Sequence, residues 1–411
     1  MAAAAALCKV DVPPVANYGV LPRDMPYNIL LLLPADVLCR FRLVSKPWRS
    51  LTSDSVFIKA HASRHPLLVG TGHSSGEIHV VDFAGDIVKK ICPSQLTSNL
   101  QRLFDSLGSR DHNTQLDLFC VEAPHSFAVL NLATGTVAAN VLIERWGRRY
   151  PDAPTSIVGY VPSTGEYKVL RIHHQSFSQY GRGHAQACEV IALGGKGKGA
   201  GTWRLRCNGS VVVDTRSRHA AVVGGVAYFL VDLIACANVR PDSIACFDFT
   251  TEAWRPELLP GPLSSLNLTI DEATVHNGTR AFRLAALGGY LVTVDYNLLN
   301  RSTDLWFLEN MDKPLWTKRY PIGDPPPWDQ WLFYLNGVSF PLEVLDDGRI
   351  IVWAEDARVL QAYDPQKGTW DDFSTMKDYN AMSMFQGSLF VFCSPDTTFL
   401  TLLEDDDFKV G

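Results

Sequence analysis

The chain has 411 residues, of which 46% are hydrophobic and 19% are charged, and its formal net charge is −6. This length and this ordinary composition suit a globular protein with room for two domains. The charge is uneven, because residues 1–65 hold eight Lys and Arg against four Asp and Glu, which leaves the rest acidic. An acidic large domain argues against a general nucleic-acid binder, whose affinity depends on neutralising phosphates.

Cysteine usage and the N-terminal sequence indicate the compartment. The nine cysteines are scattered and form no C-x-x-C pair, so neither a zinc ribbon nor a redox motif is predicted. Free thiols in apolar runs suit a reducing compartment. The alanine run at residues 2–6 has no basic lead, so it is not a signal peptide, and the apolar run at residues 29–33 is too short to cross a bilayer. We therefore predict an intracellular protein, cytoplasmic or nuclear, with no membrane association.

Residues 1–20 are predicted to form a flexible tail, and residues 21–65 to form four short helices. In the helical stretch, apolar residues recur at i, i+3, i+4 spacing. The expected N-caps, in chain order, are Asp24, Asp36, Ser45 and either Ser53 or Asp54. Pro34 ends the first helix, because the residue before a proline is pushed out of the α region. Helices of about ten residues are marginal alone, so these four must share a small core or borrow that of a partner.

The helical stretch resembles an F-box. The residues that carry the resemblance are Leu21-Pro22, Ile29-Leu30, Leu33-Pro34, the run from Leu38 to Val44 that contains Arg40-Phe41-Arg42, and Trp48-Arg49 followed by Leu51. Two positions depart from the family pattern. Pro26 stands where an apolar helix former is usual, and Leu43-Val44-Ser45 replaces a run that more often contains cysteine. Both departures are compatible with the predicted helices.

The resemblance implies a module that binds a Skp-type adaptor protein and, through it, the cullin of a ubiquitin ligase. We predict no catalytic residue, cofactor or metal in this chain. Carried over to this sequence, the adaptor-binding residues are Leu21, Pro22, Ile29, Leu30, Leu33, Pro34, Leu38, Phe41, Val44, Trp48 and Leu51. The alternative is that residues 21–65 are only the helical cap of a larger domain, with their leucines all in its core.

From residue 66 to residue 411 the sequence predicts a large all-β domain, with one helix expected at residues 97–107. A loose repeat consists of a strand that ends in an aromatic residue and Asp or Asn, followed by a Thr/Gly turn and often by Trp. Its copies are Phe247–Trp254 and Tyr363–Trp370, with weaker ones at Leu130–Val137 and Tyr160–Tyr167. Glycine hairpin turns at residues 224–225, 288–289 and 387, and the Asp347-Gly348 turn, accompany the repeat.

A repeat of this kind fits a β-propeller blade of the Kelch type, and the length allows six to eight blades. A two-sheet sandwich or a split propeller is the alternative architecture. The region resembles the F-box-associated, Kelch-like domain of plant F-box proteins. That resemblance implies that residues 66–411 present loops to a target protein. The loop Trp328-Asp329-Gln330-Trp331, which follows three prolines, is the candidate target-binding loop, because tryptophans often anchor interfaces. The alternative, which the common use of large aromatic side chains in packing favours, is that both tryptophans belong to the core.

Four motifs suggest chemistry, and for each we favour a structural interpretation. Gly72–Gly76 matches G-x-S-x-G, but a strand pattern follows it where a hydrolase needs a helix. The glycine-rich stretch 194–202 lacks the ending of a phosphate-binding loop. The pairs His61/His65 and His184/Cys188 have no third metal ligand, and are expected at a helix end and in a strand. The rival functional hypotheses are a propeller enzyme or carbohydrate-binding protein with a helical cap, and an adaptor-binding protein that works outside ubiquitination.

Overall fold

The structure is a computed structural model, and it describes most of the chain between residues 24 and 385. The described residues are 24–33, 35–52, 54–72, 77–91, 114–115, 118–123, 126–132, 136–142, 155–176, 184–193, 203–206, 209–215, 220–236, 238–268, 275, 279–297, 299, 302–311, 313–323, 340–354 and 357–385. The predictions that lie outside them are the N-terminal tail, the helix at residues 97–107, the glycine-rich stretch, the tryptophan loop, the glycine turn at residue 387, and Leu21, Pro22, Pro34 and Ser53.

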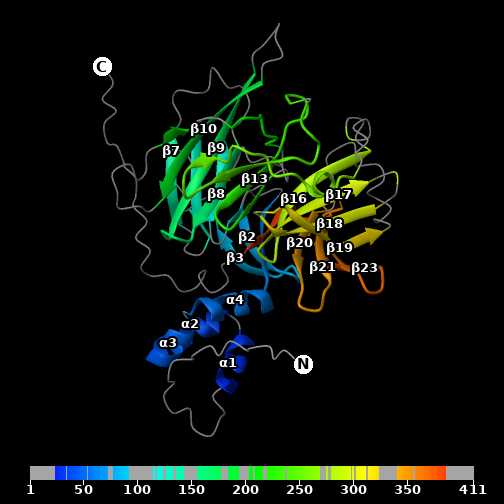
Figure 1. Cartoon of the computed structure of the whole chain (residues 1–411). Helices are drawn as coiled ribbons and strands as arrows, with labels where there is room; N and C mark the ends of the chain where they lie inside the picture. The colour runs from blue at the N-terminus through cyan, green and yellow to red at the C-terminus, as the bar shows by residue number, and fades with distance from the viewer. Residues whose placement is uncertain are drawn as a thin grey trace, which may run out of the picture.

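Four short helices form the N-terminal part of the described chain and lie together beside the sheets (Figure 1). They are α1 (Asp24–Leu31), α2 (Ala35–Val44), α3 (Lys46–Thr52) and α4 (Ser55–Arg64). A further short helix, α6 (Pro262–Ser265), lies among the strands. None of the helices in the described ranges is long and apolar enough to cross a membrane.

Two of the predicted helix caps are confirmed and two are wrong. The Ser45 hydroxyl accepts a hydrogen bond from the Trp48 amide at 3.3 Å, ahead of α3. Asp54 Oδ1 accepts from two backbone amides of the first turn of α4, at 2.9 and 3.2 Å. Asp24 and Asp36, by contrast, lie inside the first turns of α1 and α2 rather than before them.

The described strands form six four-stranded antiparallel sheets. The strands of the first three sheets are β24 (Tyr379–Phe385), β1 (Leu67–Gly72), β2 (Ile78–Asp82) and β3 (Ile87–Ile91); β4 (Thr114–Gln115), β5 (Leu118–Ala123), β6 (Ser126–Asn131) and β7 (Thr136–Leu142); and β8 (Thr155–Val161), β9 (Glu166–Ser176), β10 (His184–Leu193) and β11 (Arg204–Arg206). Those of the other three are β12 (Ala220–Val223), β13 (Val226–Leu230), β14 (Ile244–Asp248) and β15 (Ala253–Trp254); β16 (Arg280–Leu287), β17 (Tyr290–Asn297), β18 (Ser302–Asn310) and β19 (Leu315–Gly323); and β20 (Phe340–Val344), β21 (Ile350–Ala354), β22 (Val359–Asp364) and β23 (Thr369–Thr375).

The sheets form a closed ring. Five pairs of neighbouring sheets contact one another through their first strands, which are β24 and β4, β4 and β8, β12 and β16, β16 and β20, and β20 and β24. The sixth pair of sheets is joined by a contact between β8 and β13. The first and the last of the described strands close the ring, because β1 and β24 belong to the same sheet. They pair with Leu67 opposite Phe385 and Gly72 opposite Tyr379. This arrangement excludes the two-sheet sandwich.

Apolar layers fill the spaces between neighbouring sheets. Strand β21 shows the pattern: Ile350 and Val352 pack against the sheet of β16–β19, while Ile351 and Trp353 pack toward the sheet that closes the ring. Both faces of such a strand are buried, so its sequence is apolar throughout instead of alternating. Five of the junctions between sheets contain a described cluster of this kind.

The sequence repeat corresponds to the turn between the third and fourth strands of a sheet. At three of these turns the last residue of the third strand is an aspartate whose Oδ1 accepts backbone amides of the turn; these are Asp82, Asp248 and Asp364. Such Asx turns explain the predicted motif. One copy is misplaced, however, because the segment Tyr160–Tyr167 joins the first and second strands of its sheet. The predicted positive φ at the Asp-Gly turn is confirmed, since Gly348 has φ 85°.

Consecutive strands are antiparallel, so their connections leave the ring at alternate faces. The turns between first and second strands, and those between third and fourth, lie on one face, which we call the turn face. Strand β1 is the second strand of its sheet, so its first residue, Leu67, also lies at the turn face. The four helices precede Leu67 directly and are therefore attached at the turn face (Figure 1).

Candidate functional site

The four N-terminal helices have a small core of their own. Its buried members are Leu30, Leu31, Leu38 and Phe57, and its half-buried members are Tyr27, Leu33, Phe41, Trp48, Leu51 and Ala60. Aromatic edges join the helices, with ring centroids 5.3 Å apart for Tyr27 and Phe57 and 4.7 Å apart for Phe41 and Trp48. Every described member of this cluster belongs to the helical stretch, so its packing needs no contribution from the sheets.

Hydrogen bonds reinforce the same core. The ring Nε2 atoms of His61 and His65, in and after the last turn of α4, donate to the carbonyl oxygens of Leu33 and Leu31, at 2.8 and 3.0 Å. Burial lowers the pKa of His61, the Leu33 carbonyl opposes that effect, and nearby His65 adds to it. The expectation that these histidines end a helix is confirmed, and their nitrogens satisfy the carbonyls that the end of α1 leaves unpaired.

Large apolar side chains of the helices also remain exposed to solvent. Ile29 in α1 is 46% exposed and Val44 at the end of α2 is 71% exposed. Leu32 and Val56, which the sequence analysis did not select, are more exposed than Ile29. Leu32 follows Ile29 by three residues, which is a spacing that the sequence could have revealed. Exposed apolar side chains gathered on so small a unit are typical of a surface that binds a partner.

The structure thus divides the predicted adaptor-binding residues into three groups. Leu30 and Leu38 are core residues; Leu33, Phe41, Trp48 and Leu51 are half-buried around the core; and Ile29 and Val44 face solvent. The remaining three predicted residues lie outside the described ranges. Of these eight residues, those in the exposed and half-buried groups present solvent-exposed surface that another protein could contact.

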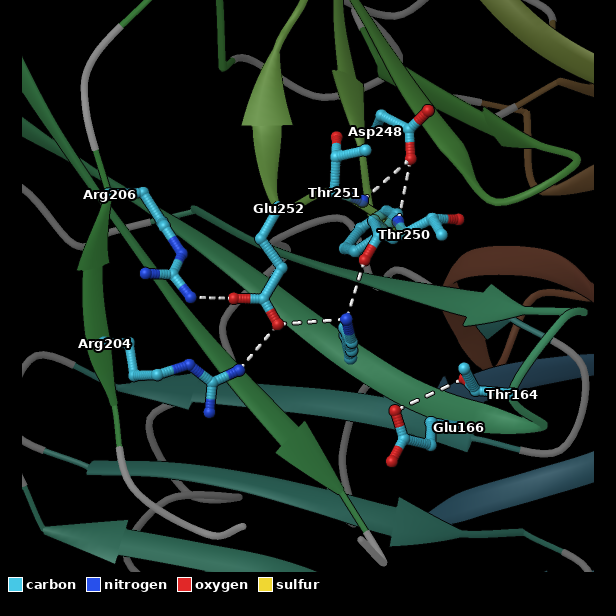
Figure 2. Close-up of polar contacts among 10 residues, drawn as sticks. Thr164, Glu166, Arg204, Arg206, Asp248, Thr250, Thr251 and Glu252 are labelled. Carbon is cyan, nitrogen blue, oxygen red and sulfur yellow. Dashed lines mark hydrogen bonds and ion pairs between the residues drawn. The ribbon is translucent and has the colours of Figure 1, made fainter. Parts of the chain in front are cut away.

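A second candidate site is a cluster of charged side chains between two neighbouring sheets. Figure 2 shows Arg204 and Arg206 of β11 converging on the carboxylate of Glu252, in the turn between β14 and β15. Arg204 Nη2 lies 2.6 Å from Glu252 Oε1, and Arg206 donates to Glu252 Oε2. Lys168 Nζ of β9 lies 2.9 Å from Glu252 Oε1 and also donates to the Phe249 carbonyl at 2.9 Å. The cluster therefore joins two sheets at the turn face.

Local structure positions each member of this charged cluster. Arg204 and Arg206 are two residues apart on the outermost strand of their sheet, so both side chains point to the same face, while Leu205 between them is exposed. Glu252 has φ 53°, a left-handed conformation that is uncommon for a residue with a side chain. The Asp248 carboxylate holds the turn by accepting the amides of Thr250 and Thr251 at 2.8 and 3.3 Å.

The three basic side chains of the cluster favour the ionised form of Glu252. Burial alone would raise the pKa of Glu252, but hydrogen bonds from Arg206, Arg204 and Lys168 lower it to about 2. Glu252 is therefore ionised at neutral pH, yet three cations surround its single negative charge. Of the two other carboxylates drawn in Figure 2, Asp248 accepts backbone amides of its own turn and Glu166 contacts the Thr164 hydroxyl.

We expect the substitution Glu252→Gln to reduce the acid sensitivity of the protein. Because the pKa of Glu252 in the folded chain, about 2, lies below its ordinary value of 4.5, its ionised form stabilises the fold above pH 4.5. That contribution is lost as the pH falls from 4.5 towards 2. Urea midpoints measured across this range should therefore fall more steeply for the wild type than for E252Q. Parallel curves for the two proteins would show that the three cations do not hold Glu252 ionised.

Two other polar clusters are internal to the sheets. Glu189 Oε1 lies 2.9 Å from His173 Nε2 and 3.3 Å from Arg171 Nη1, all three being buried on β9 and β10. At the closure of the ring, the His79 ring contacts the Tyr379 hydroxyl at 2.9 Å and the Glu77 carboxylate at 3.0 Å. Among the described residues no group of three or more His, Cys, Asp or Glu could hold a metal ion.

The remaining sequence motifs have structural positions. Strand β2 begins at Ile78, shortly after the G-x-S-x-G stretch, and pairs antiparallel with β1. A nucleophile elbow requires a helix at that point, so the hydrolase interpretation is wrong. His184 and Cys188 lie on the same strand, β10, as expected.

A ring of four-stranded antiparallel sheets, closed by pairing of its first strand with its last along the chain, defines a β-propeller. The chain belongs to the family of F-box associated beta propeller domains, whose family model matches residues 118–391, about two thirds of its length. The ring seen in the structure extends beyond this match at its N-terminal side, because β1 to β4 precede residue 118.

Similar proteins come from Arabidopsis thaliana. One, which carries the provisional name of an F-box protein, is 24% identical over 330 residues, covering 72% of this chain and 70% of the relative. Another, named as an F-box protein, is 22% identical over 315 residues, covering 73% of this chain and 74% of the relative. Among solved structures, a chain of a nidogen/laminin complex superposes on 78% of this chain and 98% of its own length, with 11% identity and a TM-score of 0.41. That superposition is too loose to add to the family assignment.

Proposed function

We propose that this chain is a substrate-recognition subunit of an SCF-type, cullin-based ubiquitin ligase. The observation that carries the proposal is a helical unit with its own core and with exposed apolar side chains, joined to a propeller of the F-box associated family. The F-box would comprise residues 21–65 and the propeller residues 66–411. We further propose that the six sheets are the blades of a six-bladed, Kelch-like propeller.

In this proposal the helices bind a Skp-type adaptor protein, which in turn binds the cullin. Ile29 and Val44 supply apolar contact area, together with Leu32 and Val56. Removing such side chains from water on binding contributes roughly 25 cal/mol per Å² of apolar surface. The buried residues Leu30 and Leu38 hold the helices in position and do not themselves reach the adaptor.

The role of the chain in ubiquitin transfer is proximity, with no reaction carried out by its own residues. A target protein held by the propeller has a high effective concentration beside the ubiquitin-carrying enzyme, and this raises the rate of transfer to the target's lysines. The proposal requires no cofactor. It places the protein inside the cell, in the cytoplasm or the nucleus, where buried free thiols such as Cys188 and Cys246 stay reduced.

The proposal is tested by calorimetric titration of the purified full-length chain with a recombinant Skp-type adaptor. We expect saturable binding with one adaptor per chain and a negative heat-capacity change, because apolar surface is buried. Titration with the cullin alone serves as the control and should give no heat of binding. Absence of adaptor binding by a chain with a cooperative melting transition would leave the helices as a simple cap of the propeller.

A further inference from the structure

The charged cluster of Arg204, Arg206, Lys168 and Glu252 has features that a purely structural ion pair does not need. One carboxylate is sufficient to pair one or two cations, but here it faces three. Lys168 is almost entirely buried and its ammonium is also bound by the Phe249 carbonyl. The two arginine side chains are different, because they remain 29% and 30% exposed at the edge of the sheet.

The guanidinium of Arg206 also has unused hydrogen-bonding capacity. Its Nε atom is buried and has no hydrogen-bond partner among the described residues. A buried donor without a partner is costly, and native structures usually explain one by a function or by a bound group. The Nη2 atom of the same guanidinium binds Glu252, so the unsatisfied donor lies beside the position that an anion already occupies.

The position of the pair on the fold makes it reachable from outside. Strand β11 is the outermost strand of its sheet, and no other strand in the described part of the chain pairs with its far edge. Leu205, between the two arginines, is 67% exposed on the opposite face of the strand and offers an apolar contact beside the charged one. An edge strand with two arginines on one face and a leucine on the other suits a polypeptide that carries an anionic group next to apolar side chains.

We propose that Arg204 and Arg206 form a binding site for an anionic group, a phosphate or a carboxylate, carried by the target polypeptide. In the free protein Glu252 occupies this site as an internal counterion. An incoming anion takes over donors of the two guanidiniums, while Lys168 keeps Glu252 anchored to the neighbouring sheet. Arginine is suited to this task, because its planar group binds phosphate and carboxylate through two parallel hydrogen bonds.

The inference rests on the proposed function only for the identity of the carrier, since a target polypeptide is what a recognition subunit would bind. Anion binding itself is a property of this chain alone. A failure to bind anions would leave adaptor binding by the helices intact, and a failure to bind the adaptor would leave anion binding intact. The two proposals are therefore separable by experiment.

The test is calorimetric titration of the full-length chain with inorganic phosphate, then with a short phosphoserine peptide and the same peptide carrying aspartate. Four proteins are compared: the wild type, R204Q/R206Q, E252Q and R319Q. We expect R204Q/R206Q to bind at least about tenfold more weakly, since each charge-assisted hydrogen bond contributes substantially. E252Q should bind several-fold more tightly, because it removes the competing negative charge while keeping the size of the side chain. Binding should also weaken as salt is added.

R319Q is the matched control, because Arg319 is similarly exposed at 33% and pairs with a single carboxylate, that of Glu309 at 2.7 Å. It should bind like the wild type. If R204Q/R206Q fails to fold, E252Q decides the matter, because a structural role predicts no gain in affinity for it. The same affinity in all folded proteins, or no saturable binding by either the wild type or E252Q, overturns the proposal. A preference for the phosphoserine peptide or for the aspartate peptide identifies the anion.

Discussion

Replacing Ile29 and Val44 together by aspartate is expected to abolish adaptor binding without unfolding the protein. Both side chains are exposed, at 46% and 71%, so the substitutions leave the small helical core untouched. On the proposed interface they bury two charges without partners, which is strongly unfavourable. We expect the dissociation constant for the adaptor, measured by calorimetry, to rise by about a hundredfold or more. The thermal melting curve should coincide with that of the wild type.

The control for this variant is L205D/L315D, which places two aspartates at exposed leucines of the propeller. It should bind the adaptor as the wild type does. Unchanged adaptor binding by I29D/V44D would show that these helices do not dock through the exposed residues. Leu38 is unsuitable for this experiment, because it is fully buried and a charge there would unfold the helical unit whether or not it binds a partner.

Replacing Gly70 by valine is expected to open the closure of the propeller. Gly70 lies on β1, and a Cβ atom added to it would lie only 2.4 Å from Met382 Sδ and 2.7 Å from Tyr379 Cδ1. Both neighbours belong to β24, the strand that completes this sheet. Inserting carbon atoms into so tight a contact typically costs about 1–3 kcal/mol. We expect the free energy of unfolding in urea to fall by this amount, and the contact between Tyr379 and His79 to be lost with it.

The matched control is A286V on β16, which adds the same kind of branched side chain at an exposed position of an inner strand. This variant should unfold at the wild-type urea concentration. If G70V were as stable as the wild type, the pairing of β24 with β1 would not be the contact that holds the ring closed.

The sequence was sufficient to predict the elements that depend on interactions between residues close together in the chain. The helix starts at Ser45 and Asp54 depend on side chains that reach amides two or three residues away, and both starts are confirmed. The repeat was recognisable because an aspartate ends the third strand and caps the turn that follows, as at Asp248 and Asp364. The same logic failed at Tyr160, where a similar run of residues serves a different turn. Local chemistry identifies a turn, but it does not say which strands the turn joins.

Features that depend on distant pairing were not accessible from the sequence. Helical spacing marked both Leu30 and Val44 as apolar-face residues, yet one is buried and the other exposed, because burial depends on which helix packs against which. The charged cluster joins Lys168, Arg204 and Glu252, which come from three separate stretches of the chain. The sequence drew attention to the glycine-rich stretch just before Arg204 and passed over the arginines themselves.

The mass of the assembled complex shows whether this chain connects a target-binding propeller to a cullin ligase, as we propose. The full-length chain, a Skp-type adaptor and a cullin are mixed in equal amounts and separated by size-exclusion chromatography with light scattering. We expect one species whose mass is the sum of the three proteins, and we expect this species to be lost when I29D/V44D replaces the wild type. Elution of this chain apart from an intact adaptor–cullin pair would show that the chain is not such a subunit.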